Sequence, residues 1–164
     1  MQPSIEYWRK ELQLEPHSEG GFFKETARSE QTIKTSRGQR PLYTSILFLL
    51  TDKNPSHLHR LNSDETWYYH ANDPLSIHCI FPDGHYQEIV IGPQVDKGQV
   101  LSYTVPKNTI FGSSVAQGHS LVSCVVAPGF DYRDFELFTQ EELLKLYPQH
   151  QTIIKQLAYQ SLPH

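Results

Sequence analysis

The stretch SHLHRLNSDETWYYH (residues 56–70) combines two histidines, an acidic pair and several aromatic residues, a composition typical of two short β-strands joined by a turn. His57 and His59 are separated by one residue, which places both side chains on the same face of a strand. Three residues of the second run share a face in the same way: Glu65, Trp67 and Tyr69. If the two runs lie on neighbouring strands, we expect all of these side chains to enter one barrel interior.

Runs of the same kind continue through residues 41–138. Short segments rich in β-branched and aromatic residues alternate there with turn signals such as Pro82-Asp83-Gly84. Strands at intervals of roughly 8–12 residues indicate an all-β sandwich or barrel. Residues 32–41 (TIKTSRGQRP) are polar, and we predict a mobile loop there.

Helices are predicted at the two ends of the sequence. Ser4 can cap a helix that runs through IEYWRKELQL (5–14). Thr139 and Glu142 have the spacing of a capping box, which predicts a helix start near the end of the barrel. The segment QTIIKQLAYQ (151–160) predicts a final helix.

We expect a single domain of residues 1–164, with a barrel core at about 20–138 and a helical C-terminal segment at 139–162. The net charge is −4 and the basic residues form no stripe, so nucleic acid is not an expected partner. The longest strongly apolar run, residues 45–50, is too short to cross a bilayer, and two cysteines make no disulfide framework. We therefore expect a cytoplasmic protein without a membrane partner.

Two chemistries fit the histidines and the glutamate. His57, His59 and Glu65 can bind a divalent metal (Fe, Zn, Mn or Ni), because imidazole and carboxylate groups are suitable ligands for such ions. Without metal, a histidine beside a carboxylate can take up and release a proton by itself. A third interpretation treats the histidines as polar residues on a partly exposed strand.

The order of two histidines, a short turn and a glutamate resembles the first motif of the cupin superfamily, in which Glu65 stands at the carboxylate position. The second motif corresponds to GQVLSYTVPKNTIF (98–111), where Gly98 and Pro106 match. Phe111 stands where the superfamily has its last metal-binding histidine. The usual set of four ligands is therefore incomplete.

One branch of the superfamily, the cupin-5 group (DUF985), resembles the chain more closely. The matching segments are EPHSEGGFFKETARS (15–29), TSILFLL (44–50), SHLHRLNSDETWYYHANDPLSI (56–77), VPKNTIFGS (105–113) and SLVSCVVAPGFDYRDFEL (120–137). The resemblance implies a double-stranded β-helix jelly roll, a homodimer and no established activity. It also implies a shape similar to metal-free cupins of the dTDP-4-dehydrorhamnose 3,5-epimerase type.

The acidic turn before the first long strand is a signature of this branch. Glu19 is followed there by Gly20-Gly21, a pair that is typical of a turn or a bulge. The resemblance implies that Glu19 and Glu25 reach the rim of a pocket, and Arg28 is a candidate contact for an anion.

Aromatic and hydroxyl side chains complete the expected pocket. Trp67 and Tyr69 either belong to the barrel core or line the pocket, where their rings can stack on a planar ligand or a sugar. Phe111 is expected to be an apolar wall. Tyr43 and Ser45 are candidates to supply hydroxyl groups inside.

The leading interpretation is a pocket for a small polar or carbohydrate-like ligand, in an isomerase or epimerase that needs no cofactor. A neutral His57 or His59 would remove a proton next to a carbonyl group, Tyr69 or Tyr43 would return one, and Glu65 would orient the histidine. One alternative is a metal-dependent cupin enzyme with a site of two histidines and one carboxylate. The other is a non-catalytic ligand-binding or sensor domain.

Overall fold

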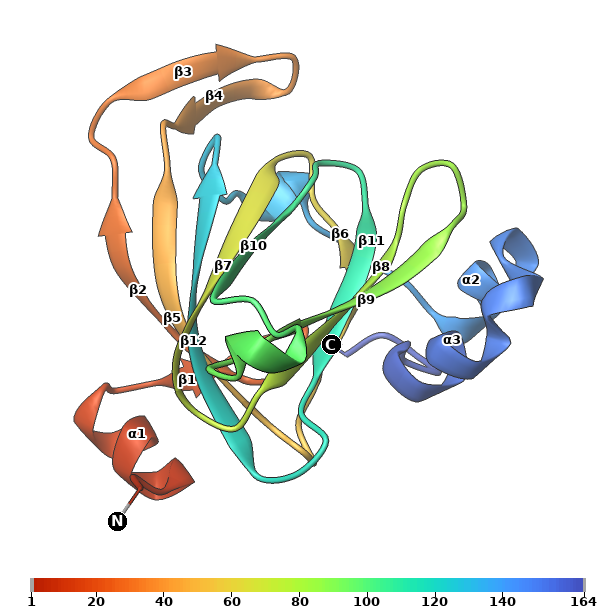
Figure 1. Cartoon of the computed structure of the whole chain (residues 1–164). Coiled ribbons are helices and arrows are strands. Elements are labelled where there is room, and N and C mark those ends of the chain that lie inside the picture. Colours follow the sequence, from red (N-terminus) through yellow and green to blue (C-terminus); the bar gives the residue numbers. More distant parts are fainter. Residues whose placement is uncertain (1, 164) are drawn as a thin grey trace.

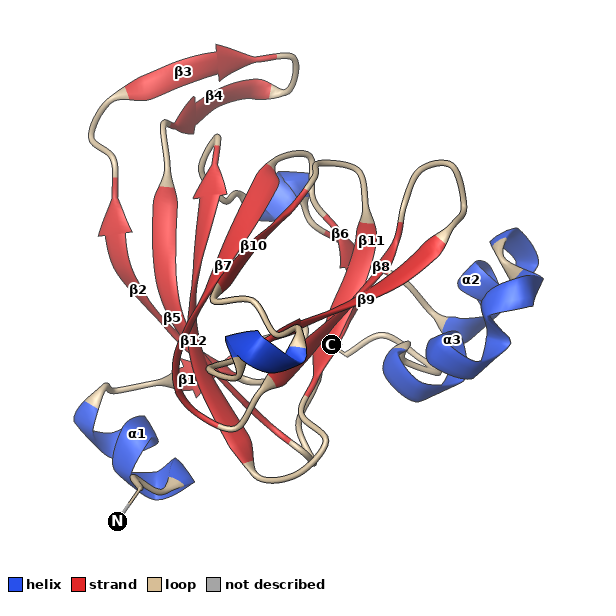
Figure 2. Ribbon diagram, in the orientation of Figure 1, coloured by secondary structure: helices blue, strands red, loops and turns tan. Residues whose placement is uncertain are grey.

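Two antiparallel sheets form a β-sandwich in the computed structural model, which describes residues 2–163 (Figures 1 and 2). In spatial order, the larger sheet contains β1 (Glu15–Pro16), β2 (Phe22–Arg28), β5 (Thr44–Thr51), β12 (His119–Ala127), β7 (Asp64–Asn72) and β10 (Ser102–Val105). The smaller sheet contains β13 (Glu136–Leu137), β6 (Ser56–Arg60), β11 (Ile110–Ser114), β8 (Leu75–Ile80) and β9 (Tyr86–Ile91). The predicted all-β class is confirmed.

The main core fills the space between the sheets, because alternate residues of each strand point inward. Both sheets supply buried apolar side chains to it: Phe48, Leu50, Trp67, Val122 and Cys124 from one sheet, and Ile77, Cys79, Ile89 and Phe111 from the other. Trp67 and Phe111, two expected pocket residues, are therefore core residues that are at most 1% exposed.

The helices cover the outer faces of the sandwich (Figure 2). They are α1 (Ile5–Glu11), α2 (Gln140–Leu146) and α3 (Gln151–Leu157), with short 3-10 turns η1 (Val95–Lys97), η2 (Tyr132–Asp134) and η3 (Pro148–His150). The predicted caps are confirmed: Ser4 accepts a hydrogen bond from the Tyr7 backbone N–H, and Thr139 forms a capping box with Glu142. Leu143, Ile154 and Leu157 pack on the outer face of the smaller sheet, against Leu58 and Ile80.

The prediction of a mobile loop at 32–41 was wrong. β3 (Thr32–Thr35) and β4 (Gly38–Pro41) form a hairpin of their own, which extends beyond the end of the larger sheet (Figure 1). The hairpin is anchored at its base by Arg40, which is 1% exposed and donates hydrogen bonds to both carboxylate oxygens of Asp134, at 2.7 and 3.0 Å. A buried ion pair therefore replaces the apolar contacts that a polar hairpin lacks.

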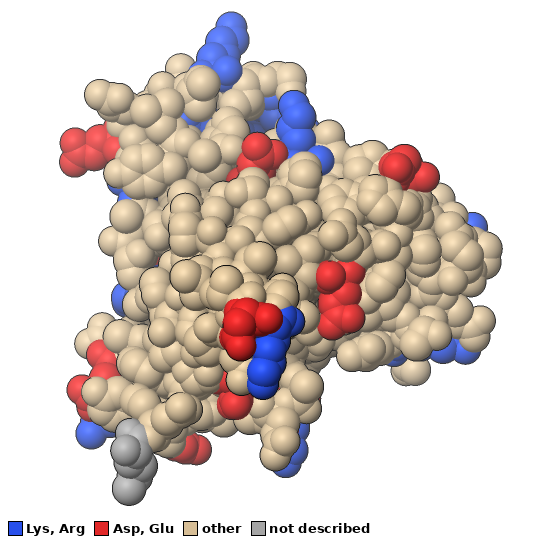
Figure 3. All heavy atoms as spheres, viewed as in Figure 1, with Lys and Arg blue, Asp and Glu red and all other residues tan. Residues whose placement is uncertain are grey.

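The surface shows no concentration of one charge on the face drawn in Figure 3, where acidic and basic side chains are scattered. Within residues 2–163, every helix is too short or too polar to span a membrane.

Candidate active site

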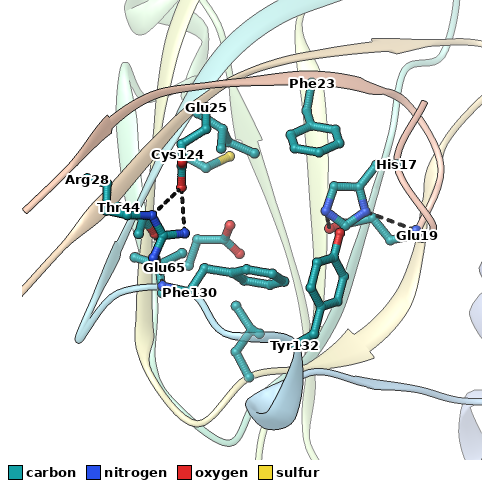
Figure 4. A pocket seen from close by; sticks show the side chains of 13 residues that line it. His17, Glu19, Phe23, Glu25, Arg28, Thr44, Glu65, Cys124, Phe130 and Tyr132 are labelled. Carbon is teal, nitrogen blue, oxygen red and sulfur yellow. Dashed lines mark hydrogen bonds and ion pairs between the residues drawn. The ribbon is translucent and has the colours of Figure 1, made fainter. Parts of the chain in front are cut away.

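A cavity of about 180 Å³ opens at one end of the sandwich, between the larger sheet and the segment that carries η2 (Figure 4). Its polar lining comes from His17, Glu19, Glu25, Arg28, Thr44, Glu65, Cys124 and Tyr132, and its apolar lining from Phe23, Ile46, Leu61, Val126 and Phe130. The volume is somewhat larger than the ~150 Å³ apolar cavity that accepts benzene. The cavity can therefore hold one small ring.

Glu19 reaches the interior because the turn that follows it is built on two glycines. Gly20 and Gly21 have φ angles of 108° and 75°, which only glycine adopts without strain. A Cβ atom at Gly20 would overlap the carbonyl oxygen of Pro55, and one at Gly21 would overlap the side chain of Leu50. The turn thus packs tightly against the start of β6, and Glu19 is only 6% exposed.

The Glu19 carboxylate lies beside one hydroxyl donor and two imidazole rings, of which the His59 ring donates from Nδ1 to the His57 carbonyl oxygen. Its Oε2 accepts a hydrogen bond from the Ser56 hydroxyl and lies 3.5 Å from Nε2 of His59. Its Oε1 lies 3.5 Å from Nε2 of His17. These neighbours stabilise a buried carboxylate, which otherwise carries a large desolvation cost.

The tautomer of His17 follows from its hydrogen bond to the backbone. The Glu19 N–H donates to Nδ1 of His17 at 3.1 Å, so Nδ1 is the acceptor and the neutral ring carries its proton on Nε2. Burial lowers the pKa of His17 more than the nearby Glu19 carboxylate raises it. His17 therefore presents a neutral imidazole N–H on the side of the cavity where Glu19 lies.

Glu65, on β7, also lines the cavity and is 7% exposed. Burial raises the pKa of Glu65 well above its ordinary value, and the negative charge of Glu19 raises it further. The thiol of Cys124 lies beside it, and burial also raises the pKa of that thiol. Glu65 therefore holds its proton to a higher pH than an ordinary glutamate does.

Arg28 and Glu25 form an ion pair at the mouth of the cavity. Nη2 and Nε of Arg28 both donate to Oε1 of Glu25, at 2.7 and 3.1 Å (Figure 4). Both side chains are about half exposed, 49% and 41%, so the pair contributes little to stability. Figure 4 shows it across the cavity from His17 and Tyr132.

The structure separates the two histidines that the sequence places on one face. His59 pairs with Phe111 of β11, and Ser56 pairs with Ser113. Between these two pairs β6 has two residues, His57 and Leu58, whereas β11 has only one, which is the pattern of a β-bulge. This bulge breaks the alternation of the strand. His59 stays next to Glu19, but His57 donates from Nδ1 to the Glu19 carbonyl oxygen at 2.8 Å and lies outside the cavity lining.

The remaining predicted residues lie apart from the cavity. The Tyr69 hydroxyl donates to the Asn72 carbonyl oxygen at 2.7 Å, and Tyr43 is 44% exposed. Ser45 lies between Thr44 and Ile46, which line the cavity, and is not part of the lining itself. Phe111 packs on the His59 ring, with 4.2 Å between ring centroids, and supports the site from behind.

His17, Phe130 and Tyr132 are among the lining residues that the sequence-based set of pocket residues does not include. His17 belongs to the same acidic turn as Glu19, and this short spacing is the signal that could have identified it. Phe130 and Tyr132 lie in APGFDYRDFEL (127–137), a segment whose proline and glycine suggest only a structural turn.

Comparison with known proteins identifies the family of the chain. Residues 6–138 match the family described as "Cupin superfamily (DUF985)". The chain belongs to this DUF985 family. The match includes every residue that lines the cavity.

Relatives of this DUF985 protein include two solved structures. A hypothetical protein from Leishmania major is 51% identical, with a TM-score of 0.93, and the alignment covers 96% of this chain and 99% of that one. A Shewanella oneidensis protein is 43% identical, with a TM-score of 0.91 and coverage of 97% and 99%. The uncharacterised yeast protein YML079W (Saccharomyces cerevisiae) is 28% identical, over 87% of this chain and 79% of its own length.

The metal site of the wider cupin superfamily does not fit the residues of this DUF985 protein. His57 is held outside the cavity by the Glu19 carbonyl, and Phe111 fills the place of a histidine ligand. Across residues 2–163, no three side chains of the metal-binding types converge in a way that could hold an ion. The acids, bases and hydrogen-bond donors that line the cavity are therefore the groups available for chemistry.

Proposed function

We propose that this DUF985 protein is an isomerase that moves a proton between adjacent carbon atoms of a small, polar, carbohydrate-like carbonyl compound. The observation that carries the proposal is the pairing of the Glu19 carboxylate with the neutral His17 N–H in the wall of the cavity. A carboxylate base beside a neutral imidazole donor is a known solution for proton transfer next to a carbonyl group.

In the proposed reaction, Glu19 removes the proton from the carbon next to the carbonyl group. His17 donates a hydrogen bond from Nε2 to the carbonyl oxygen and stabilises the negative charge that develops there. The hydroxyl group on the deprotonated carbon gives its proton, through Nε2 of His17, to the former carbonyl oxygen. Glu19 then returns the carbon-bound proton to the former carbonyl carbon. The sequence-based interpretation gave the role of base to His57 or His59 and the orienting role to Glu65. The proposal uses the Glu19 carboxylate as the base, because Nδ1 of His17 accepts a hydrogen bond and Nε2 carries the proton.

The position of Tyr132 supports an isomerase over an epimerase. The rings of Tyr132 and His17 lie 6.4 Å apart, and the tyrosine hydroxyl points toward the histidine (Figure 4). Burial and the charge of Glu19 raise the pKa of Tyr132, so the hydroxyl stays protonated and can donate. All three groups lie on one side of the ligand space, which suits removal and return of a proton on the same face.

Solvent exchange tests the proposal. The protein is incubated in ²H₂O with three- to six-carbon aldoses, ketoses and amino sugars, and deuterium incorporation next to the carbonyl group is followed by NMR. We expect incorporation with a member of the panel, and a loss of roughly 10²- to 10⁴-fold in Glu19→Gln, the range for removal of a general base.

His17→Gln is expected to slow the exchange and His70→Gln, on the exposed face of β7, to leave it unchanged. Absence of exchange with the whole panel, or exchange that persists in Glu19→Gln, would contradict the proposal.

A further inference from the structure

Glu65 has no part in the proposed proton transfer, although its carboxyl group is buried and lines the cavity. It is 7% exposed, and the polar groups beside it are the Trp67 indole and the Cys124 thiol, neither of which is a cation. No lysine, arginine or histidine within residues 2–163 forms an ion pair with it. An unpaired carboxyl group aimed into a ligand cavity is costly, which indicates a role in binding.

The other charged groups around the cavity do not supply the missing cation. Arg28 is already paired with Glu25 at the mouth, and His17 is neutral because burial lowers its pKa. Glu19 adds a negative charge next to Glu65. His59 lies behind Glu19, with its Nε2 3.5 Å from Glu19 Oε2. The interior therefore contains two carboxyl groups and lacks a free positive charge of its own.

The apolar walls are also suited to a cationic ligand. Phe23, Phe130 and Tyr132 line the same cavity, and aromatic rings attract an ammonium group and the polarised C–H groups next to it. A bare metal ion would need three converging donors, which the described residues do not offer. An ammonium group needs only one carboxylate and a few hydrogen-bond acceptors.

We infer that the ligand is an amino-bearing carbohydrate, whose ammonium group binds Glu65 while its carbonyl end lies at Glu19 and His17. The inference rests on the proposed function for the identity of the reacting end. The substrate class follows, because one end of the cavity then binds the carbonyl group and the other end binds the ammonium group of the same small molecule.

Binding of the ammonium group is coupled to a proton. Without ligand, burial favours the protonated form of Glu65. When the ammonium group binds, Glu65 forms an ion pair with it, and the proton that Glu65 held passes to solvent. The balance is one carboxylic acid and one ammonium ion giving one carboxylate–ammonium pair and one H⁺. A neutral or an anionic sugar supplies no positive charge that would stabilise the ionised form of Glu65.

Isothermal titration calorimetry tests this coupling with three probes that share one six-membered ring: glucosamine, glucose and glucuronate. Each is titrated at pH 7 in phosphate and in Tris, because the difference in heat between the buffers reports the number of protons released. We expect glucosamine to bind roughly ten- to hundredfold more tightly than glucose, the factor of a charge-assisted hydrogen bond, with release of about one proton. Glucuronate should bind most weakly.

Glu65→Gln keeps the shape of the side chain and removes the acid. It should bring glucosamine and glucose to similar affinity and abolish proton release, whereas Glu30→Gln, on an exposed loop, should change neither. Equal affinity of wild type for glucosamine and glucose, tighter binding of glucuronate, no binding of glucosamine at all, or glucosamine binding without proton release would each overturn the inference. Glucosamine binding without any deuterium exchange would instead overturn the proposed isomerase and leave the amine site standing.

Discussion

The imidazole of His57 lies flat on the ring of Tyr159, with 3.7 Å between centroids and 12° between planes. The Tyr159 hydroxyl donates to the Ser18 carbonyl oxygen at 3.0 Å, and Nδ1 of His57 donates to the Glu19 carbonyl oxygen at 2.8 Å. The C-terminal segment and β6 thus hold the backbone of the turn that carries Glu19 from two sides. His57 positions the turn from behind, and His17 and Glu19 line the cavity.

Tyr159→Phe keeps the stack on His57 but removes the hydrogen bond to Ser18. We expect a loss of about 1 kcal/mol in the free energy of unfolding, the usual contribution of one such bond. Tyr159→Ala also removes the ring and should cost about 2 kcal/mol. Urea unfolding measures both, with Tyr68→Phe as the exposed control. Equal stability of Tyr159→Ala and wild type would show that the segment does not hold the turn.

Glu65→Gln is expected to stabilise the protein at pH 8. Burial and the charge of Glu19 raise the pKa of Glu65 in the folded state above its value in the unfolded chain. The folded protein therefore binds more protons between these two values, and its stability falls as the pH rises through that window. Glutamine removes this dependence, so the advantage of the variant should shrink toward pH 4. Thermal unfolding at both pH values measures this difference, with Glu30→Gln as the control. A stability gain of Glu65→Gln that grew at low pH would contradict the raised pKa of Glu65.

His78 should make the protein less stable at acid pH. It lies on the outer face of β8, where its ring nitrogens contact the hydroxyls of Tyr86 and Ser114 at 2.7 and 2.9 Å. Burial lowers its pKa in the folded state, and the nearby Glu88 carboxylate only partly offsets this. The unfolded chain, with a pKa of about 6.5, binds the proton first, so stability falls as the pH drops below that value.

Urea unfolding of His78→Gln at pH 7.5 and pH 5 measures this contribution. The loss of stability between the two pH values should be smaller in His78→Gln than in wild type, and unchanged in His70→Gln, whose side chain is exposed. A steeper loss in His78→Gln would mean that the folded state binds the proton more readily than the unfolded chain.

Most of the fold could be predicted from local patterns. The strands alternate apolar and polar residues because one face of each sheet is buried, and the helix starts carry capping residues whose side chains satisfy free backbone N–H groups. The hairpin β3–β4 escaped prediction because both faces of its strands are polar. Arg40 holds it through Asp134, a residue 94 positions away, and no local pattern reveals that contact.

The candidate site was predictable only in part. Glu65 and the turn with Glu19 follow from the motifs, and both line the cavity. The prediction that His57 and His59 share a face was wrong, because a bulge in β6 interrupts the alternation of its side chains. A bulge of this kind is visible only in the register between β6 and β11. Tyr132 reaches the cavity from a segment more than a hundred residues after His17, so only the tertiary structure brings the two together.

Arg40 connects the hairpin to the segment that carries Tyr132, and its removal should affect stability and activity together. Arg40→Met leaves the carboxylate of Asp134, which is 7% exposed, without its bidentate partner. A buried charge that loses its partner destabilises strongly, whereas replacement of both partners by apolar residues can restore stability. We therefore expect a clear drop of the thermal midpoint in Arg40→Met and recovery of much of it in Arg40→Met/Asp134→Leu.

The exposed pair of Arg60 and Glu136, with 2.7 Å between Nη2 and Oε2, provides the matched control. Arg60→Met should change the midpoint little, because an exposed ion pair contributes little. The same samples can be tested for deuterium exchange, which should slow in Arg40→Met because η2 no longer holds Tyr132 beside His17. Equal, small drops in Arg40→Met and Arg60→Met would show that the hairpin anchor adds no more than a surface contact.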